Sequence, residues 1–214
     1  MVPPAHFAEF AALVLVMVVV PGPSVLFTIS RALTVGRRDA LLTVLGNAAG
    51  VYSQVVAVAF GLGAIVRGSA AVFTAVKLAG AGYLVYLGVQ AVQHRRRLSE
   101  AFRQAVTTTP GRTLTVLRDG FVVGFANPKS IVFLAAVLPQ FVDYPTGRVP
   151  VQIMLLGISL PLIAVVSDSV WALAAGSARD WFARSPRRLE LIGGTGGLVM
   201  IGLGAGLAIN GRKD

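Results

Sequence analysis

The chain has 214 residues, of which 55% are hydrophobic and 13% are charged, and its mean hydropathy is +0.76. A soluble domain carries about twice that charged fraction, so a soluble globular protein is excluded. The net charge is +10. The basic residues stand between the apolar blocks, so membrane topology explains them better than a nucleic-acid partner does. The absence of cysteine and the presence of only two histidines exclude disulfides and thiolate or histidine metal sites, and no cofactor is expected.

The apolar blocks are long enough to cross a bilayer, which takes about 20 residues in a helix. They predict an all-α integral membrane protein, because a lipid-exposed chain must satisfy its backbone polar groups internally and the alternating strands of a barrel are absent. The first block continues past any plausible cleavage point, so we take it as a span and not as a signal peptide. Six spans are expected, at about residues 5–29, 39–66, 70–92, 119–142, 150–177 and 191–210.

Two of these spans contain a proline break. The first contains "VVVPGPSVLF" at residues 18–27, and the fourth contains "ANPKSIVF" at residues 126–133. Proline inside a helix removes a donor and clashes with the preceding turn. In both spans the break is followed by serine, aliphatic residues and phenylalanine.

Basic residues gather in alternate loops, at about 30–40, 93–118 and 178–190, which hold most of the 19 Lys and Arg residues. The positive-inside rule places these loops in the cytoplasm and both termini outside. The stretch "HRRRL" at 94–98 is a candidate lipid headgroup site, but a role in fixing topology explains it more simply.

The third loop, about 94–118, divides one membrane domain of residues 1–214 into two three-span halves, at about 1–93 and 119–214. An odd number of spans in each half inserts the second half upside down relative to the first. This topology is that of an inverted repeat with broken first helices, which is common among transporters.

Broken helices are tolerated at membrane depth only where they are buried in protein or line a wet cavity, and their ends can hold polar substrates. We therefore expect a central substrate site between the two breaks. Its walls would be formed by Pro21, Gly22 and Pro23 on one side and Asn127, Pro128 and Lys129 on the other.

Two charges sharpen this expectation. Lys129 and Asp168 fall at similar depth on adjacent antiparallel spans. The pair could bind a zwitterion, with a carboxylate on Lys129 and an ammonium on Asp168; it could equally be a static pair between two helices. Asp168 could also carry a coupling proton. Asn47 and Gln54 either line the cavity or bond between helices, and Gly46-x-x-x-Gly50 favours close helix packing.

Several stretches together resemble the LysE/RhtB family of bacterial amino-acid exporters. "PGPSVLFTISRALTVGRRDALLTVLGNAAG" is similar to the family's PGP motif, basic first loop and second helix, and "KLAGAGYLVYLGVQ" to its third helix. "GFVVGFANPKSIVFLAAVLPQFVD" is similar to its asparagine-proline-lysine segment, and "IGGTGGLVMIGLGAGLAI" to its last helix. The resemblance implies an inner-membrane exporter driven by the proton gradient, with functional positions at the two breaks.

The chain departs from the family at one place. Many members carry an acid just after the glycine of the second helix and often a histidine three residues later, where this chain has Val51 and Gln54. Because the acid and the histidine are missing here, Asp168 becomes the candidate for binding a cation or carrying a proton.

We therefore expect a proton-motive-force-driven exporter of an amino acid or small derivative, embedded in membrane lipids, which could form a homodimer. The main alternative is a passive channel for small polar solutes. A membrane enzyme is disfavoured by the scarcity of Cys and His, and a structural subunit would not need two midplane charges.

Overall fold

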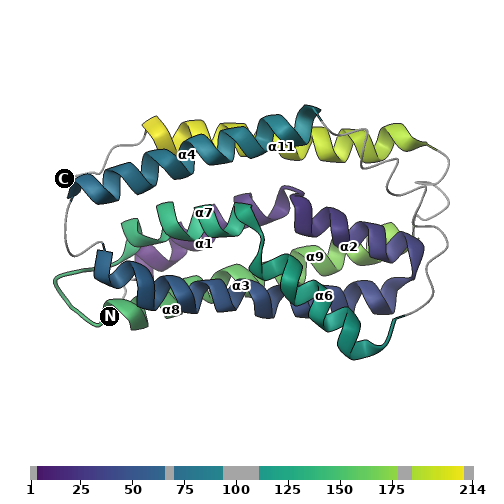
Figure 1. Ribbon diagram of the computed structural model, residues 1–214, viewed down its shortest axis with the longest axis horizontal. Helices are drawn as coiled ribbons and strands as arrows, with labels where there is room; N and C mark the ends of the chain where they lie inside the picture. Colours follow the sequence, from purple (N-terminus) through teal and green to yellow (C-terminus); the bar gives the residue numbers. More distant parts are fainter. Residues whose placement is uncertain (1–3, 66–69, 94–110, 178–184, 210–214) are drawn as a thin grey trace.

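The computed structural model describes residues 4–65, 70–93, 111–177 and 185–209 (Figure 1). These residues are nearly all helical and contain no strand, which confirms the predicted all-α class for the described part of the chain. The basic stretch at 94–98 and parts of the second and third basic loops lie outside the described residues. The helices are α1 (Pro4–Val19), α2 (Pro23–Thr34), α3 (Arg37–Ile65), α4 (Ala70–Gln93), α6 (Thr113–Phe125), α7 (Pro128–Ala136), the 3-10 helix η2 (Leu138–Phe141), α8 (Val149–Gly157), α9 (Ser159–Ser177) and α11 (Pro186–Ile209).

Both predicted breaks are present. The first predicted span is divided into α1 and α2, which meet at a bend of 49°, and the fourth into α6 and α7, which meet at 45°. Pro23 and Pro128 stand at the start of α2 and α7. At that position the missing N–H is not needed and the fixed φ suits a helix, so each proline ends one half-helix and begins the next.

The number of spans is supported only in part. By length and composition, α3 and the continuous α8–α9 segment can each cross a membrane, and each bent pair can cross if it is counted as one span. The helices at the third and sixth predicted spans, α4 and α11, contain shorter apolar stretches, at Leu78–Gln90 and Gly197–Gly206. The described residues thus support up to four of the six predicted spans.

The α8–α9 segment contains an irregularity that the sequence did not lead us to expect. The two helices are separated at Ile158, and Pro161 follows in the first turn of α9. Proline cannot donate to the carbonyl four residues earlier, which accounts for an interruption at this place.

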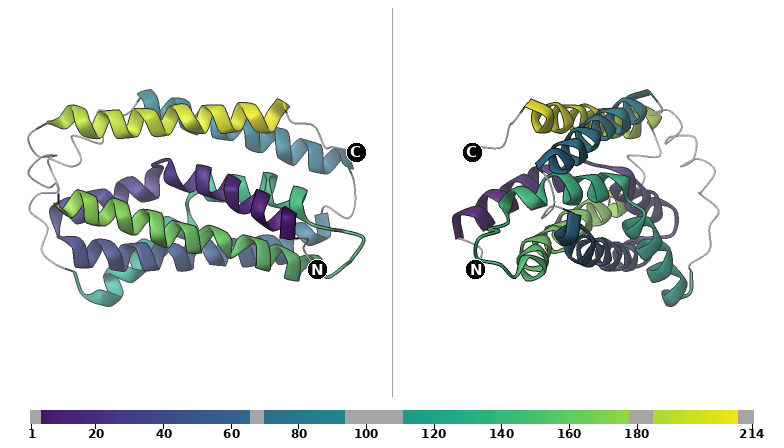
Figure 2. Two further views of the ribbon diagram at one scale, coloured as in Figure 1. Left: turned by 180° about the vertical axis from the view of Figure 1, so that it is seen from behind. Right: turned by 60° about the vertical axis from the view of Figure 1, so that its left-hand side comes forward.

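Helices α4 and α11 run side by side as a layer of their own (Figures 1 and 2). Their backbones approach closely at two glycines. A Cβ atom at Gly88 would lie 2.5 Å from the carbonyl oxygen of Gly197, and one at Gly197 would lie 2.6 Å from that of Gly88. Helix α4 joins the layer to the rest of the molecule through α7.

Helix α3 is the centre of the larger layer and packs on α6, α9, α2 and α8. Cβ atoms at Gly46 and Gly50 would collide with the α6 backbone, and Cβ atoms at Gly120 and Gly124 would collide with the α3 backbone. The predicted packing role of Gly46-x-x-x-Gly50 is confirmed, with a matching pair of glycines on the partner helix. Small residues on both helices allow this approach.

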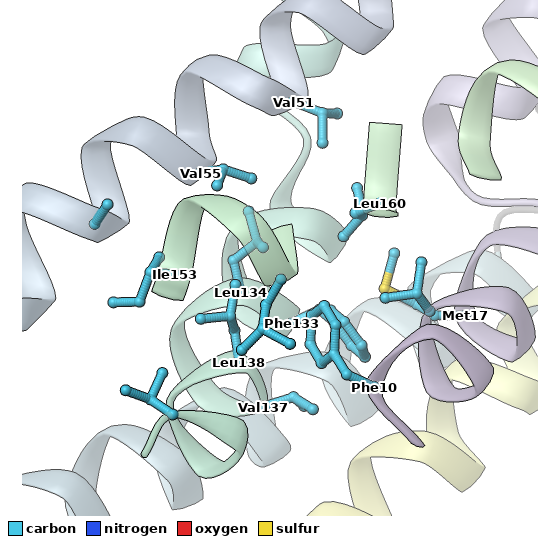
Figure 3. Close-up of a cluster of buried hydrophobic side chains, with 14 of the residues drawn as sticks. Phe10, Met17, Val51, Val55, Phe133, Leu134, Val137, Leu138, Ile153 and Leu160 are labelled. Carbon is cyan, nitrogen blue, oxygen red and sulfur yellow. The ribbon is translucent and has the colours of Figure 1, made fainter. Parts of the chain in front are cut away.

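The three loops predicted as basic are flanked by helix ends that lie together at one end of the bundle (Figure 1). Side-chain hydrogen bonds join these ends. Arg37 donates to Ser177 Oγ at 3.0 Å, and Arg38 donates to Thr113 Oγ1 at 3.0 Å. Most of the apolar core occupies the opposite end, around Phe10, Phe133 and Ile153 (Figure 3).

Candidate functional site

A small polar cavity lies between the two breaks. Its volume is about 30 Å³, which is roughly room for one water molecule. The lining comes from α1, the first break, α2, α3, the second break, α7 and α9. The residues are Met17, Val18, Gly22, Ser24, Val25, Asn47, Val51, Asn127, Lys129, Ser130, Leu160, Ala164 and Asp168.

Lys129 is 3% exposed and reaches from the second break to the first. Its Nζ donates to the carbonyl oxygen of Met17 at 2.6 Å and to that of Val20 at 2.7 Å. These are carbonyls that α1 leaves without an intrahelical partner where it ends. Gly22 makes the reach possible, because a Cβ atom there would lie 3.0 Å from Lys129 Cδ.

Asp168 projects from α9 and is 2% exposed. Its Oδ2 accepts a long hydrogen bond of 3.5 Å from Asn47 Nδ2, and its Oδ1 has no partner among the described residues. The carboxylate is thus buried with spare acceptor capacity.

Lys129 and Asp168 line the same cavity, but they do not form an ion pair within 4.0 Å. A direct static pair, one of the two sequence-based possibilities, is therefore not observed between these two described residues. The free carbonyls of the broken α1 take the ammonium instead. The two opposite charges thus line one cavity without a direct ion pair between them.

Asn127 closes the start of α7. Its Oδ1 accepts from the backbone N of Lys129 at 3.1 Å, and its Nδ2 donates to Ser24 Oγ at 3.1 Å, which joins the two breaks. Ser130 donates to the carbonyl oxygen of Asn127 at 3.0 Å. Ser24 and Ser130 were not among the predicted site residues, although the serine that follows each proline was the available signal.

Gln54 lies outside the cavity lining. Its Nε2 donates to the carbonyl oxygens of Gly124 at 3.0 Å and Phe125 at 2.7 Å, and at 3.4 Å to that of Asn127. These carbonyls end α6, so Gln54 makes the interhelical bond that was the other option at the sequence level. Its Oε1 has no partner within the described part of the chain.

The three prolines of the predicted site also lie outside the cavity lining: Pro21, Pro23 and Pro128. Their contribution is to interrupt the helices. The start of α2 stays open as a result: Gly22 precedes it without a side chain, and no side-chain cap is formed there. The first amides of a helix carry partial positive charge. The cavity therefore contains groups of both signs: Lys129 and the start of α2 suit an anion, and Asp168 suits a cation.

The chain is similar to one protein-family model and to several known proteins. The family model described as LysE type translocator matches residues 15–211. A protein of Vibrio cholerae described as an uncharacterized membrane protein is 36% identical over 192 residues, covering 88% of this chain and 89% of that protein. The homoserine/homoserine lactone efflux protein of Salmonella typhimurium is 30% identical over 188 residues, covering 88% of each chain.

A leucine efflux protein of an Enterobacter species is 26% identical over 214 residues, covering 94% of this chain and 98% of its own. No solved structure gives a significant match. The match to the family model confirms the resemblance that the motifs indicated. The chain belongs to the LysE type translocator family of membrane proteins.

Proposed function

We propose that the protein exports an amino acid or a small amino-acid derivative from the cytoplasm. Family membership supports transport, and two of the relatives are named as efflux proteins for homoserine or leucine. The observation that carries the proposal is that Lys129 and Asp168, two opposite charges, line the same cavity as the uncapped start of α2 and do not pair with each other within 4.0 Å. An amino acid carries the complementary carboxylate and ammonium.

Binding would exchange partners within the site. The substrate carboxylate replaces the carbonyls of Met17 and Val20 at the Lys129 ammonium, and the substrate ammonium takes the spare oxygen of Asp168. A cavity of about 30 Å³ is far smaller than the roughly 300–1,000 Å³ of ligand pockets, so the walls must separate first. The conformation described is a contracted one.

The motion follows from an inverted-repeat plan. In our proposal, residues 1–93 and 119–214 form two halves of three spans each, with broken first helices, in the bacterial inner membrane. The basic loops face the cytoplasm and both termini face outside. The halves rock about the central site so that it opens to one side at a time.

We further propose that an inward proton resets the site and that Asp168 carries it. Protonation removes the charge that holds the substrate ammonium. Release to the outside is then coupled to the proton gradient.

The test uses everted membrane vesicles, whose interior corresponds to the outside of the cell and is acidified by respiration. Labelled homoserine or leucine should accumulate above equilibrium in vesicles containing the protein, and a protonophore should abolish the accumulation. A passive pore would speed equilibration without accumulation.

The variants Lys129→Ala and Asp168→Asn should insert into the membrane and fail to accumulate either substrate. Asp143→Asn is the matched control, because Asp143 lies outside the cavity lining. Accumulation by both site variants at the wild-type rate would refute the assigned site.

A further inference from the structure

Different kinds of side chain lie at the two ends of the cavity. Toward the end away from the basic loops, the closure is the apolar cluster shown in Figure 3. The Phe10 ring lies 5.8 Å from that of Phe133 and 5.4 Å from that of Phe141. The buried amides at this end, those of Gln54 and Gln152, donate to backbone carbonyls. Among the described residues, the donors of both amides are therefore already used at this end, although Gln54 Oε1 keeps spare acceptor capacity.

Toward the basic loops, polar side chains continue from the cavity along two helices. On α2 they are Ser24, Thr28 and Arg31, and on α3 they are Asn47, Thr43 and Asp39. Residues three or four apart share one face of a helix, so each set forms a strip. Helices α2 and α3 pack on each other. Ser24 and Asn47, the first members of the two strips, already line the cavity.

The middle of this strip contains an unsatisfied hydroxyl. Thr28 is fully buried, and its Oγ1 has no hydrogen-bond partner in the described part of the molecule. Thr43 and Thr34 show the usual alternative, because each donates to the carbonyl oxygen four residues earlier, at 2.8 Å and 2.9 Å. A buried hydroxyl without a partner is costly, unless water or a passing polar solute satisfies it in another state.

An ion pair ends the strip. Arg31 donates to Asp119 Oδ2 at 2.9 Å and joins α2 in the first half to α6 in the second. The guanidinium also lies 3.4 Å from Thr43 Oγ1 through Nε and 5.4 Å from the centre of the Phe27 ring. The two side chains are 16% and 35% exposed, so the pair stands where the buried strip meets the surface.

We infer that Arg31 and Asp119 are gating residues that close a polar access path, over Thr28 and Thr43, between the basic-loop end and the cavity. Opening this path breaks a partly exposed ion pair and a weak hydrogen bond beside the smaller apolar cluster of α2, α3 and α9, whereas opening the other end separates the larger apolar cluster. The direction in which a substrate moves along the path rests on the proposed function. The existence of the path does not.

The chain contains no cysteine, so an introduced one is the only thiol. The experiment places Thr28→Cys in the full chain in membrane vesicles and measures its rate of modification by a charged methanethiosulfonate. With Arg31 and Asp119 intact the rate should be slow. With Asp119→Ala, or with Arg31→Gln as an independent variant, it should rise by about two- to fivefold, the effect of losing a partly exposed ion pair.

Three controls make the result specific. Arg118→Ala removes an exposed arginine beside Asp119 and should leave the rate unchanged. Asp119→Glu keeps the charge and should restore slow modification. Leu134→Cys, in the apolar cluster, should not react faster in any of these backgrounds.

An unchanged Thr28→Cys rate in both pair variants would overturn the gate, and so would an equal rise at Leu134→Cys, which would indicate general loosening. Because labelling needs no substrate, failure of the gate and failure of the proposed export give separate results.

Discussion

The two helix breaks have similar bends but solve the same physical problem differently. At the first, the ammonium of Lys129 holds the carbonyls that end α1, and the start of α2 has no side-chain cap. At the second, the neutral amide of Gln54 holds the carbonyls that end α6, and Asn127 caps the start of α7. In both cases the partner of the carbonyls comes from the other half of the chain.

The difference assigns different tasks to the breaks. A substrate carboxylate can draw the ammonium away from neutral carbonyls, because it adds an attraction between two full charges that a neutral carbonyl lacks. It gains little from an amide whose donors are already used. We therefore regard the first break as the responsive one and the second as scaffold, and three substitutions test this division.

The largest effect on stability is expected from Gln54→Leu. It leaves the carbonyls at the end of α6 without their donor, at about 0.6 kcal/mol for each bond within a membrane protein and about 2 kcal/mol in all. The melting temperature in detergent should fall, and Gln54→Glu should rescue it at most in part, because a carboxyl group has a single O–H donor when protonated and none when ionised.

Ser53→Ala is the matched control, since the exposed Ser53 hydroxyl bonds only within its own helix, to the carbonyl of Ala49. If Gln54→Leu kept full stability and lost export, Gln54 would belong to the binding site and not to the scaffold.

Gly22→Ala tests the first break. The new Cβ would lie 3.0 Å from Lys129 Cδ, so the lysine side chain must give by a few tenths of an ångström where it reaches the carbonyls of Met17 and Val20. Overpacking of this kind costs at least about 1 kcal/mol. A cost of about 1.4 kcal/mol corresponds to a tenfold loss of export measured in everted vesicles.

Gly61→Ala serves as the comparison, because a Cβ atom there meets nothing within 4 Å in the described structure. It should leave export unchanged. Equal export by the Gly22 and Gly61 variants would show that the position of Lys129 does not matter.

The smallest effect is expected from Asn127→Ala, which removes the cap of α7 and costs about 1 kcal/mol of stability. Asn127→Asp keeps the acceptor for the Lys129 backbone N–H and loses the donor to Ser24, so its melting temperature should lie between those of the alanine variant and the wild type. A melting temperature for the alanine variant equal to that of the wild type would mean that the second break needs no cap.

Much of the fold could be predicted from local signals. The two breaks could be predicted from Pro21, Gly22 and Pro23 and from the pair Asn127–Pro128, because proline restricts the backbone of its own neighbours. The apolar blocks predict the helices, and Gly46 with Gly50 predicts a close helix contact. The interruption at Ile158 was not predicted, although Pro161 lies inside the fifth predicted span and cannot donate to the carbonyl four residues earlier.

The partners of the site residues could not be predicted in this way. Lys129 was predicted at the depth of Asp168, and the two line the same cavity, but its bonds to carbonyls 109 and 112 positions earlier in the chain were not predicted. Gln54 was an open choice between substrate and structure, and only the position of the end of α6 beside α3 decides it.

By itself the sequence determined that this protein is helical, where two of its helices break, and that Lys129 and Asp168 lie inside the membrane-spanning part. The tertiary structure alone decided which break each polar side chain closes and which one it leaves open. The physical reason is range: proline geometry and apolar periodicity act within a few residues, whereas an unpaired carbonyl is satisfied by whatever donor the packing of distant helices brings within about 3 Å.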